Sequence, residues 1–237
     1  MALPRVNESP VYSMVIPSMN KEVRFRPFLM KEQKILMMAS ESNDRKQILQ
    51  AIVNTFLACV EEKIDAHKLS TFDIDYCFTQ LRAKSVGEKA ELTFSCSNCK
   101  EPVEHIIQLD KIQPPKNVKS KNIIEINNDI KIRMKYPSYS DFLNNKLMES
   151  ETTTTEMIME FLYVCMESII NKDEEISLKN ESKEEIERFL DSLSTEQFTK
   201  VAEFVQNIPR LSHTFDITCP KCNHVEKKTV EGLESFF

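Results

Sequence analysis

Two Cys-x-x-Cys pairs constrain the fold of this chain more than any other feature of its sequence. Cys96 and Cys99 lie in T-F-S-C-S-N-C-K-E, and Cys219 and Cys222 lie in D-I-T-C-P-K-C-N-H. Alternating polar and apolar residues flank each pair, which is typical of two β-strands joined by a turn. A pair at such a turn holds both thiols on one side and forms half of a tetrahedral metal site.

The two halves are predicted to share one structural Zn²⁺ ion, bound by Cys96, Cys99, Cys219 and Cys222. Residues 100–218 lie between the halves, whereas a compact zinc ribbon separates them by only about 15 to 20 residues. The intervening chain is therefore predicted to be an insertion whose two ends the metal brings together. Iron uses the same four thiolates, so the sequence leaves the choice between zinc and iron open.

Other interpretations of the cysteine pairs are weaker. A thioredoxin-like redox motif opens a helix, whereas strand-like sequence follows both pairs here. His224 is an alternative ligand, but four cysteines already complete the site. Glycine often follows the second cysteine of such a turn, and here Lys100 and Asn223 take that place. Because lysine adopts a left-handed backbone less readily than asparagine, the first half-site is expected to be the weaker one.

Composition excludes several classes of function. The chain has 237 residues and only two glycines, too few for a phosphate-binding loop, a dinucleotide fingerprint or a G-x-S-x-G nucleophile elbow. Its four histidines form no recognisable base beside a nucleophile, so we expect no enzymatic activity. A net charge of −6 favours a protein partner over nucleic acid. No secretory signal and no run of about 20 apolar residues is present, so we expect a cytosolic protein.

The rest of the pattern predicts an α+β fold, in which amphipathic helices accompany small antiparallel β-hairpins and two of the hairpins form the zinc-ribbon-like site of four cysteines. Four parts are expected: an N-terminal arm and helical region (1–87), β-hairpins with the first half-site (88–137), a helical insert (138–210), and the second half-site with a C-terminal tail (211–237). The remaining cysteines are expected on apolar helix faces, as core residues: Cys59, Cys77 and Cys165.

Local signals place the elements within these parts. Residues 10–28 are predicted to form an extended arm or hairpin, and helices are predicted from Lys31, after an N-cap at Asp44, and after Ser70. Hairpins within 90–109 and 123–136 are expected to join one sheet. Residues 138–209 are predicted to be helical, with capping boxes at Ser138 and Ser194 and a solvated loop at 171–182.

Both ends of the chain resemble one known family. Residues 3–39 contain R-P-F-L-M-K-E-Q-K-I-L, and the chain closes with C-P-K-C-N-H-V-E-K-K-T-V-E-G-L-E-S-F-F. These segments resemble the baseplate hub assembly proteins of T-even-like, contractile-tailed bacteriophages. The resemblance implies a hub subunit or assembly factor, made in the host cytoplasm and acting on other tail or hub proteins, with a place in the virion baseplate or a transient role.

A chaperone for the tape-measure protein or other hub proteins is one form of that role. The 11 methionines and 14 phenylalanines are expected on helix faces, where they either form partner-binding grooves or fill the core. The alternative function is a zinc-ribbon nucleic-acid-binding or transcription-related factor. The basic run Lys116–Lys121 would then contact nucleic acid, but without interleaved aromatic residues a linker is the better interpretation.

Overall fold

The chain folds into two compact units with mixed α and β structure. The computed structural model describes residues 10–118, 122–144, 154–172 and 174–233. The first unit comprises Met1–Ala66, Phe72–Lys116 and Arg210–Phe237, and the second comprises His67–Thr71 and Asn117–Pro209. Most of the second unit is therefore inserted in the sequence between the two cysteine pairs.

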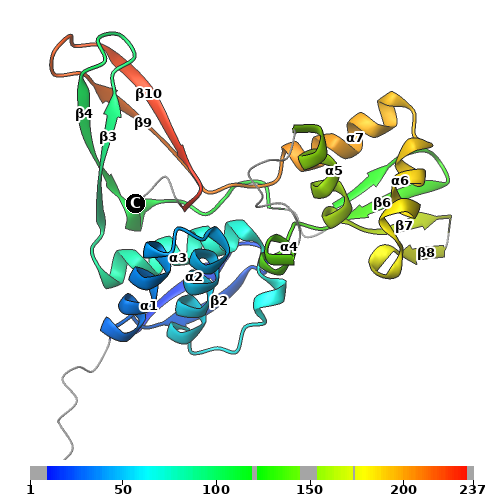
Figure 1. Ribbon diagram of the computed structural model, residues 1–237, viewed down its shortest axis with the longest axis horizontal. Helices are drawn as coiled ribbons and strands as arrows, with labels where there is room; N and C mark the ends of the chain where they lie inside the picture. Colours follow the sequence, from blue (N-terminus) through cyan, green and yellow to red (C-terminus); the bar gives the residue numbers. More distant parts are fainter. Residues whose placement is uncertain (1–9, 119–121, 145–153, 173, 234–237) are drawn as a thin grey trace, which may run out of the picture. The chain divides into compact units, whose positions relative to one another are not determined.

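A β-hairpin and three helices begin the first unit (Figure 1). Their bounds are β1 (Tyr12–Ile16), β2 (Lys21–Phe25), α1 (Met30–Glu41), α2 (Arg45–Cys59) and α3 (Thr71–Ser85). Alternation along β1 and β2 buries Met14, Ile16, Val23 and Phe25. The Asp44 carboxylate accepts hydrogen bonds from the amides of Lys46 and Gln47 at 2.9 and 3.3 Å, which confirms the predicted N-cap of α2.

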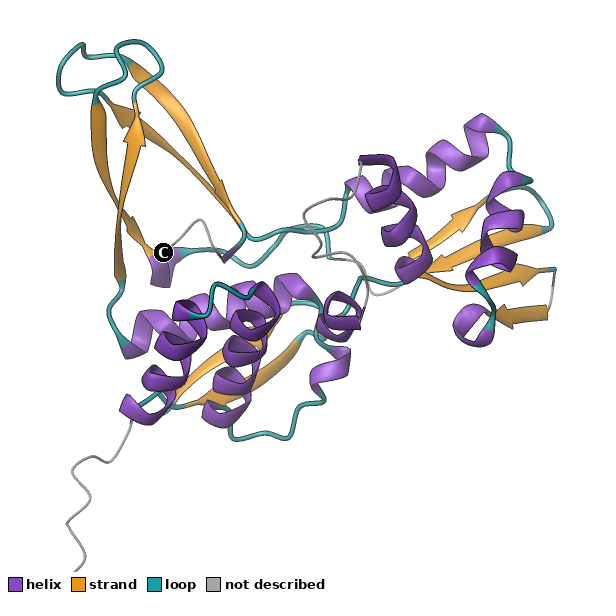
Figure 2. Cartoon of the chain, in the orientation of Figure 1, coloured by secondary structure: helices purple, strands orange, loops and turns teal. Residues whose placement is uncertain are grey.

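Two further hairpins complete the first unit. They are formed by β3 (Lys89–Ser95) with β4 (Pro102–Gln108) and by β9 (Ser212–Thr218) with β10 (Val225–Glu231). Figure 2 shows each hairpin as its own pair of strands ending in a loop, and no ladder of backbone hydrogen bonds joins the two pairs. They pack instead through an apolar cluster that extends to α3 and includes Ala83, Ala90, Ile107, Leu211 and Val230.

The second unit is a four-stranded antiparallel sheet packed on helices. The strand order is β5 (Asn122–Glu125), β6 (Ile130–Met134), β7 (Met166–Asn171) and β8 (Glu174–Ser177). The helices are α4 (Tyr139–Asn144), α5 (Thr154–Cys165), α6 (Lys183–Asp191) and α7 (Thr195–Gln206). One core joins the sheet to α5, α6 and α7, with Ile132 of β6, Leu162 of α5, Leu190 of α6 and Val201 of α7 all buried.

Two predictions about this region were wrong. The hairpin predicted within 123–136 belongs to the second unit's sheet, not to a sheet with residues 90–109. The stretch 166–177, predicted as helix and solvated loop, contains β7 and β8. Met166 and Ile169 fit a helical period, but Ile169 pairs with Ile132 of β6, so an existing strand edge decides the structure. The polar β8 forms the edge of the sheet, where charged side chains remain in water.

Other local predictions were confirmed. Ser138 and Asp141 exchange capping hydrogen bonds, as do Ser194 and Gln197. Cys59, Cys77 and Cys165 are buried, and burial raises the pKa of each thiol, to about 11 for Cys59 and about 12 for Cys165. A neutral buried thiol is unreactive, as expected of a core residue.

The methionines and phenylalanines are distributed differently. Every phenylalanine in the described ranges is buried or half-buried, so these residues fill the core. Several methionines are exposed instead: Met30, Met37, Met38 and Met157. Three of the run Lys116–Lys121, residues 119–121, lie outside the described part of the chain. Within the described ranges, no helix has both the length and the apolar character required to cross a membrane.

Candidate metal centre

The two cysteine turns have the same backbone hydrogen bonds. The amide of Cys96 donates to the carbonyl of Glu101, and the amide of Lys100 donates to the carbonyl of Cys96, at 2.9 and 3.0 Å. The second turn repeats both bonds at the same lengths, from Cys219 to His224 and from Asn223 to Cys219. The β-ladders that end at Ser95–Pro102 and Thr218–Val225 bring the ends of each turn together. Two hairpin tips of the same shape therefore present the four thiols.

A left-handed residue closes each turn. Lys100 has φ +62° and Asn223 has φ +56°. This backbone conformation costs a non-glycine residue roughly 1–2 kcal/mol, and asparagine tolerates it better than lysine. The structure therefore locates the strain that was expected at Lys100, although both turns keep the same hydrogen bonds.

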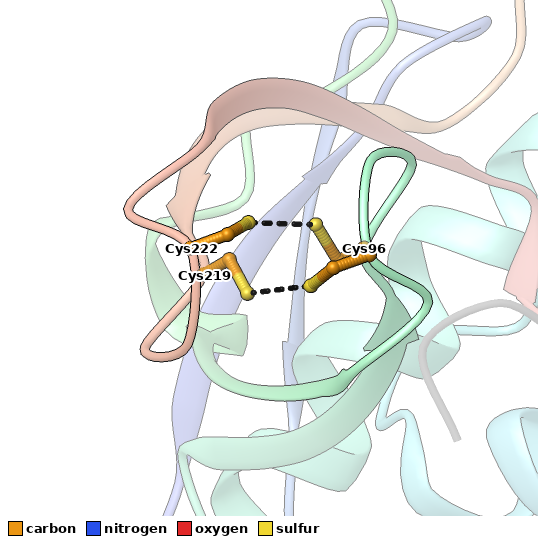
Figure 3. Close-up of side chains that lie close together, drawn as sticks. Cys96, Cys219 and Cys222 are labelled. Atoms are coloured by element: carbon orange, nitrogen blue, oxygen red, sulfur yellow. Dashed lines mark hydrogen bonds between the residues drawn. The ribbon is translucent and has the colours of Figure 1, made fainter.

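The four thiols converge although they come from distant parts of the sequence (Figure 3). The sulfur atoms of Cys96 and Cys222 are 3.8 Å apart, and those of Cys99 and Cys219 are 3.5 Å apart. All four lie within 4.8 Å of one another. A tetrahedron with metal–sulfur bonds of about 2.3 Å has edges of about 3.8 Å. The spacing therefore fits one metal ion and is far longer than the roughly 2.05 Å of a disulfide bond.

The four thiols and the turn amides influence one another's ionisation. The amide of His224 is the main cause that lowers the pKa of Cys222. The amide of Glu101 acts in the same direction on Cys99, but desolvation and the neighbouring thiols outweigh it and raise the pKa of Cys99 to about 12. Once one thiol ionises, its neighbours resist ionisation because like charges repel. A divalent cation removes this repulsion and allows all four thiolates to form.

Comparison with known proteins identifies the family. The family model described as "T4 bacteriophage base plate protein" matches residues 9–237. The chain belongs to this T4 baseplate protein family. No curated protein and no solved structure matches it. Membership covers both cysteine pairs and the insert between them, and it supports a role in the phage tail baseplate among other tail proteins.

Side chains from both hairpins surround the cysteines of this baseplate-family chain. An apolar cluster contains Cys96, Cys219, Val103 of β4 and Ile217 of β9. At the rim, the amide of Ser97 donates to Glu226 at 3.0 Å, and Lys221 forms an ion pair with Glu101 at 2.6 Å. Because no backbone ladder joins the hairpins, these side-chain contacts hold the two tips together, and the four cysteines could add a metal ion to them.

The histidines of the baseplate-family chain lie outside the group of four sulfurs. His224 Nε2 is 3.1 Å from Ser97 Oγ, where it contributes to the contact between hairpins. The His105 ring stacks on Phe215 with centroids 4.2 Å apart, and His213 lies on the same phenylalanine at 5.6 Å. His67 belongs to the second unit, and its Nδ1 atom lies 2.5 Å from the Oγ atom of Ser140. The described geometry therefore favours four cysteine ligands over a set that includes His224.

Proposed function

We propose that this baseplate-family chain is a subunit or assembly factor of the baseplate hub, acts by binding other tail proteins, and holds a structural Zn²⁺ ion. The match of the family model to residues 9–237 carries the proposal. The proposed metal centre supports a structural role, because four protein thiolates close the coordination shell. A catalytic zinc keeps one position open for water or substrate, so we propose that the chain is not an enzyme.

Co-expression tests the binding function. The chain is expressed with the tape-measure protein or a hub protein of the same phage, and the mixture is separated by size-exclusion chromatography. Co-elution with one of them supports the proposal, and elution of the chain alone from every combination contradicts it. In the control, the tail protein is replaced by a protein from outside the tail that has a similar length and net charge to that tail protein.

A second measurement separates a subunit from a chaperone. Both work in the host cytoplasm during assembly, but only a subunit stays in the finished baseplate. Mass spectrometry of purified virions detects a retained subunit. If the chain is needed for tail assembly but missing from virions, it is a chaperone for the tape-measure protein or another hub component.

The alternative, a zinc-ribbon nucleic-acid-binding factor, has less support from charge. Two lysines of the β9–β10 hairpin that could contact phosphate are engaged with carboxylates, Lys221 with Glu101 and Lys228 with Glu226. The sequence pI of about 5.4 points the same way. Retention on DNA at low salt, lost steeply as salt rises, would favour this alternative over the hub function.

A further inference from the structure

Helix α1 is amphipathic in the opposite sense from a normal surface helix. Its buried residues are Glu32 and Ala39. Its exposed apolar side chains are Met30, Ile35, Met37 and Met38, at 64%, 52%, 51% and 71% of their full accessibility. A surface helix normally turns its apolar stripe toward the core. Here that stripe faces solvent.

Polar contacts hold α1 in this orientation. Glu32 accepts hydrogen bonds from Arg26 and from the amide of Leu29, both at 2.8 Å. Arg26 also donates to the carbonyls of Pro27 and Ala58, which ties the start of α1 to the end of α2. The inward face is thus fixed by an ion pair and its hydrogen bonds, so the outward position of the methionines is a property of the folded unit.

The exposed apolar side chains are concentrated on this helix and on its N-cap residue, Leu29. Five of the fourteen large apolar residues that are exposed in the described ranges lie within ten consecutive positions, and they are Leu29, Met30, Ile35, Met37 and Met38. Met30, Met37 and Met38 follow the i, i+7, i+8 spacing of one helix face. Exposed apolar residues grouped on one face mark an interaction site more often than scattered single residues do. Methionine side chains adapt their shape readily to an apolar partner.

Charged residues on the same face indicate which partner fits. Lys34 follows Met30 by four positions and precedes Met38 by four, so it lies among the methionines, and Glu41 lies two turns further on the same line of the helix. Both are exposed, and neither forms an ion pair with another described residue. A lysine toward the N-terminus and a glutamate at the C-terminus also oppose the helix dipole, so this order does not stabilise α1 by itself.

We infer that α1 pairs with α1 of a second copy of this chain, antiparallel and around a twofold axis. In that arrangement Lys34 of one copy lies opposite Glu41 of the other, twice, and Met37 and Met38 of both copies meet at the centre. A twofold interface requires one surface that is complementary to itself, and the order basic, apolar, acidic along α1 meets that requirement. Antiparallel packing also opposes the two helix dipoles favourably.

Charge exchange tests this pairing. The apparent mass is measured by sedimentation equilibrium from about 1 to about 300 µM, a range chosen because an interface below about 1,200 Å² gives a weak complex. The wild-type chain is expected to change from a 27.6 kDa monomer to a dimer across this range. Lys34→Glu and Glu41→Lys each place like charges opposite each other and are expected to weaken dimerisation by about tenfold. The double variant, which exchanges the two charges, is expected to return to within about threefold of wild type.

Further variants complete the test. Met37→Glu is expected to abolish the dimer, whereas Val86→Glu, at another exposed apolar position, and Lys63→Glu, at another exposed lysine, leave it unchanged. A wild-type chain that remains monomeric at every concentration overturns the inference, and so does a dimer that survives Met37→Glu or a double variant that fails to recover. Another outcome is a chain that is monomeric and yet binds a tail protein. If Met37→Glu then abolishes that binding, the exposed face of α1 binds the tail protein, and pairing with a second copy of the chain is ruled out. The hub proposal stands or falls separately, by co-elution.

Discussion

The sulfur atoms of Cys99 and Cys219 lie 3.5 Å apart although 120 positions separate them in the sequence. The first lies at the tip of the β3–β4 hairpin and the second at the tip of the β9–β10 hairpin. No ladder of hydrogen bonds links these hairpins, so a metal shared by the four cysteines would add a link across 120 positions of the sequence. The entropy of closing a loop rises with its length, so this link should matter for stability.

Replacement of a single cysteine, in either half-site, should remove the metal. Cys96→Ser and Cys219→Ser each leave three thiolates, and we expect the ratio of bound zinc to protein, measured by elemental mass spectrometry, to fall from near one to near zero. Cys77→Ala, a cysteine buried in α3 away from the site, should keep its zinc. Full metal content in both serine variants would contradict a shared site.

Thiol titration should divide the seven cysteines into two classes. In the metal-bound native protein, a disulfide reagent should modify none of them quickly, because the metal masks four and the core masks three. A strong chelator should release four fast thiols. Denaturant should then expose the other three, Cys59, Cys77 and Cys165, whose pKa values are raised by burial. Equal fast labelling with and without chelator would show that no metal protects the site.

Glycine at position 100 should relieve strain in the first cysteine turn. Lys100 has φ +62°, so Lys100→Gly should raise the free energy of unfolding by about 0.5 kcal/mol after the entropy of the unfolded glycine is subtracted. Lys100→Ile should lower it by about 1 kcal/mol, because a β-branched residue tolerates this backbone poorly. Urea unfolding measures both. Lys89→Gly, in the extended strand β3, is the matched control and should destabilise.

The buried Glu32 should make stability depend on acid pH. Burial would raise the pKa of Glu32, but hydrogen bonds from Arg26, Leu29 and Lys31 outweigh it and lower that pKa from 4.5 to about 2. The carboxylate therefore contributes its full stabilisation above about pH 4.5 and loses it as the pH falls toward about 2. Glu32→Gln should lower the free energy of unfolding by about 2 kcal/mol at pH 7.

The difference in the free energy of unfolding between wild type and Glu32→Gln should narrow steadily below pH 4.5. Urea unfolding at a series of pH values measures this difference. Acid also protonates the cysteine thiolates, but it does so in both proteins, so the effect cancels in the difference. Glu22→Gln, an exposed position on β2, is the control and should change stability little at any pH. A difference that does not vary with pH would argue against an ionised, paired Glu32.

Much of the site could be predicted because its determinants are local. A Cys-x-x-Cys between two alternating stretches specifies a hairpin tip by itself, and the repeated pattern predicted that Cys96, Cys99, Cys219 and Cys222 would form one group. The caps at Asp44, Ser138 and Ser194 were equally predictable, since a capping bond joins residues only two or three positions apart.

Strand partners and helix orientation could not be predicted in this way. Met166 and Ile169 fit the helical period as well as a strand, and β7 forms because the edge of β6 is available to it. The sequence left open whether the methionines of α1 would face a partner or the core, because the outward face depends on Arg26 and Glu32 meeting at the inner side.

The sequence by itself therefore determined the hairpin tips, the helix starts and the pairing of the two cysteine motifs, since each rests on interactions between near neighbours or on a repeated pattern. Only the tertiary structure decided which sheet each hairpin joined and which side of α1 was buried. Both depend on contacts between residues far apart in the chain, whose free energies compete with local preference and here exceed it.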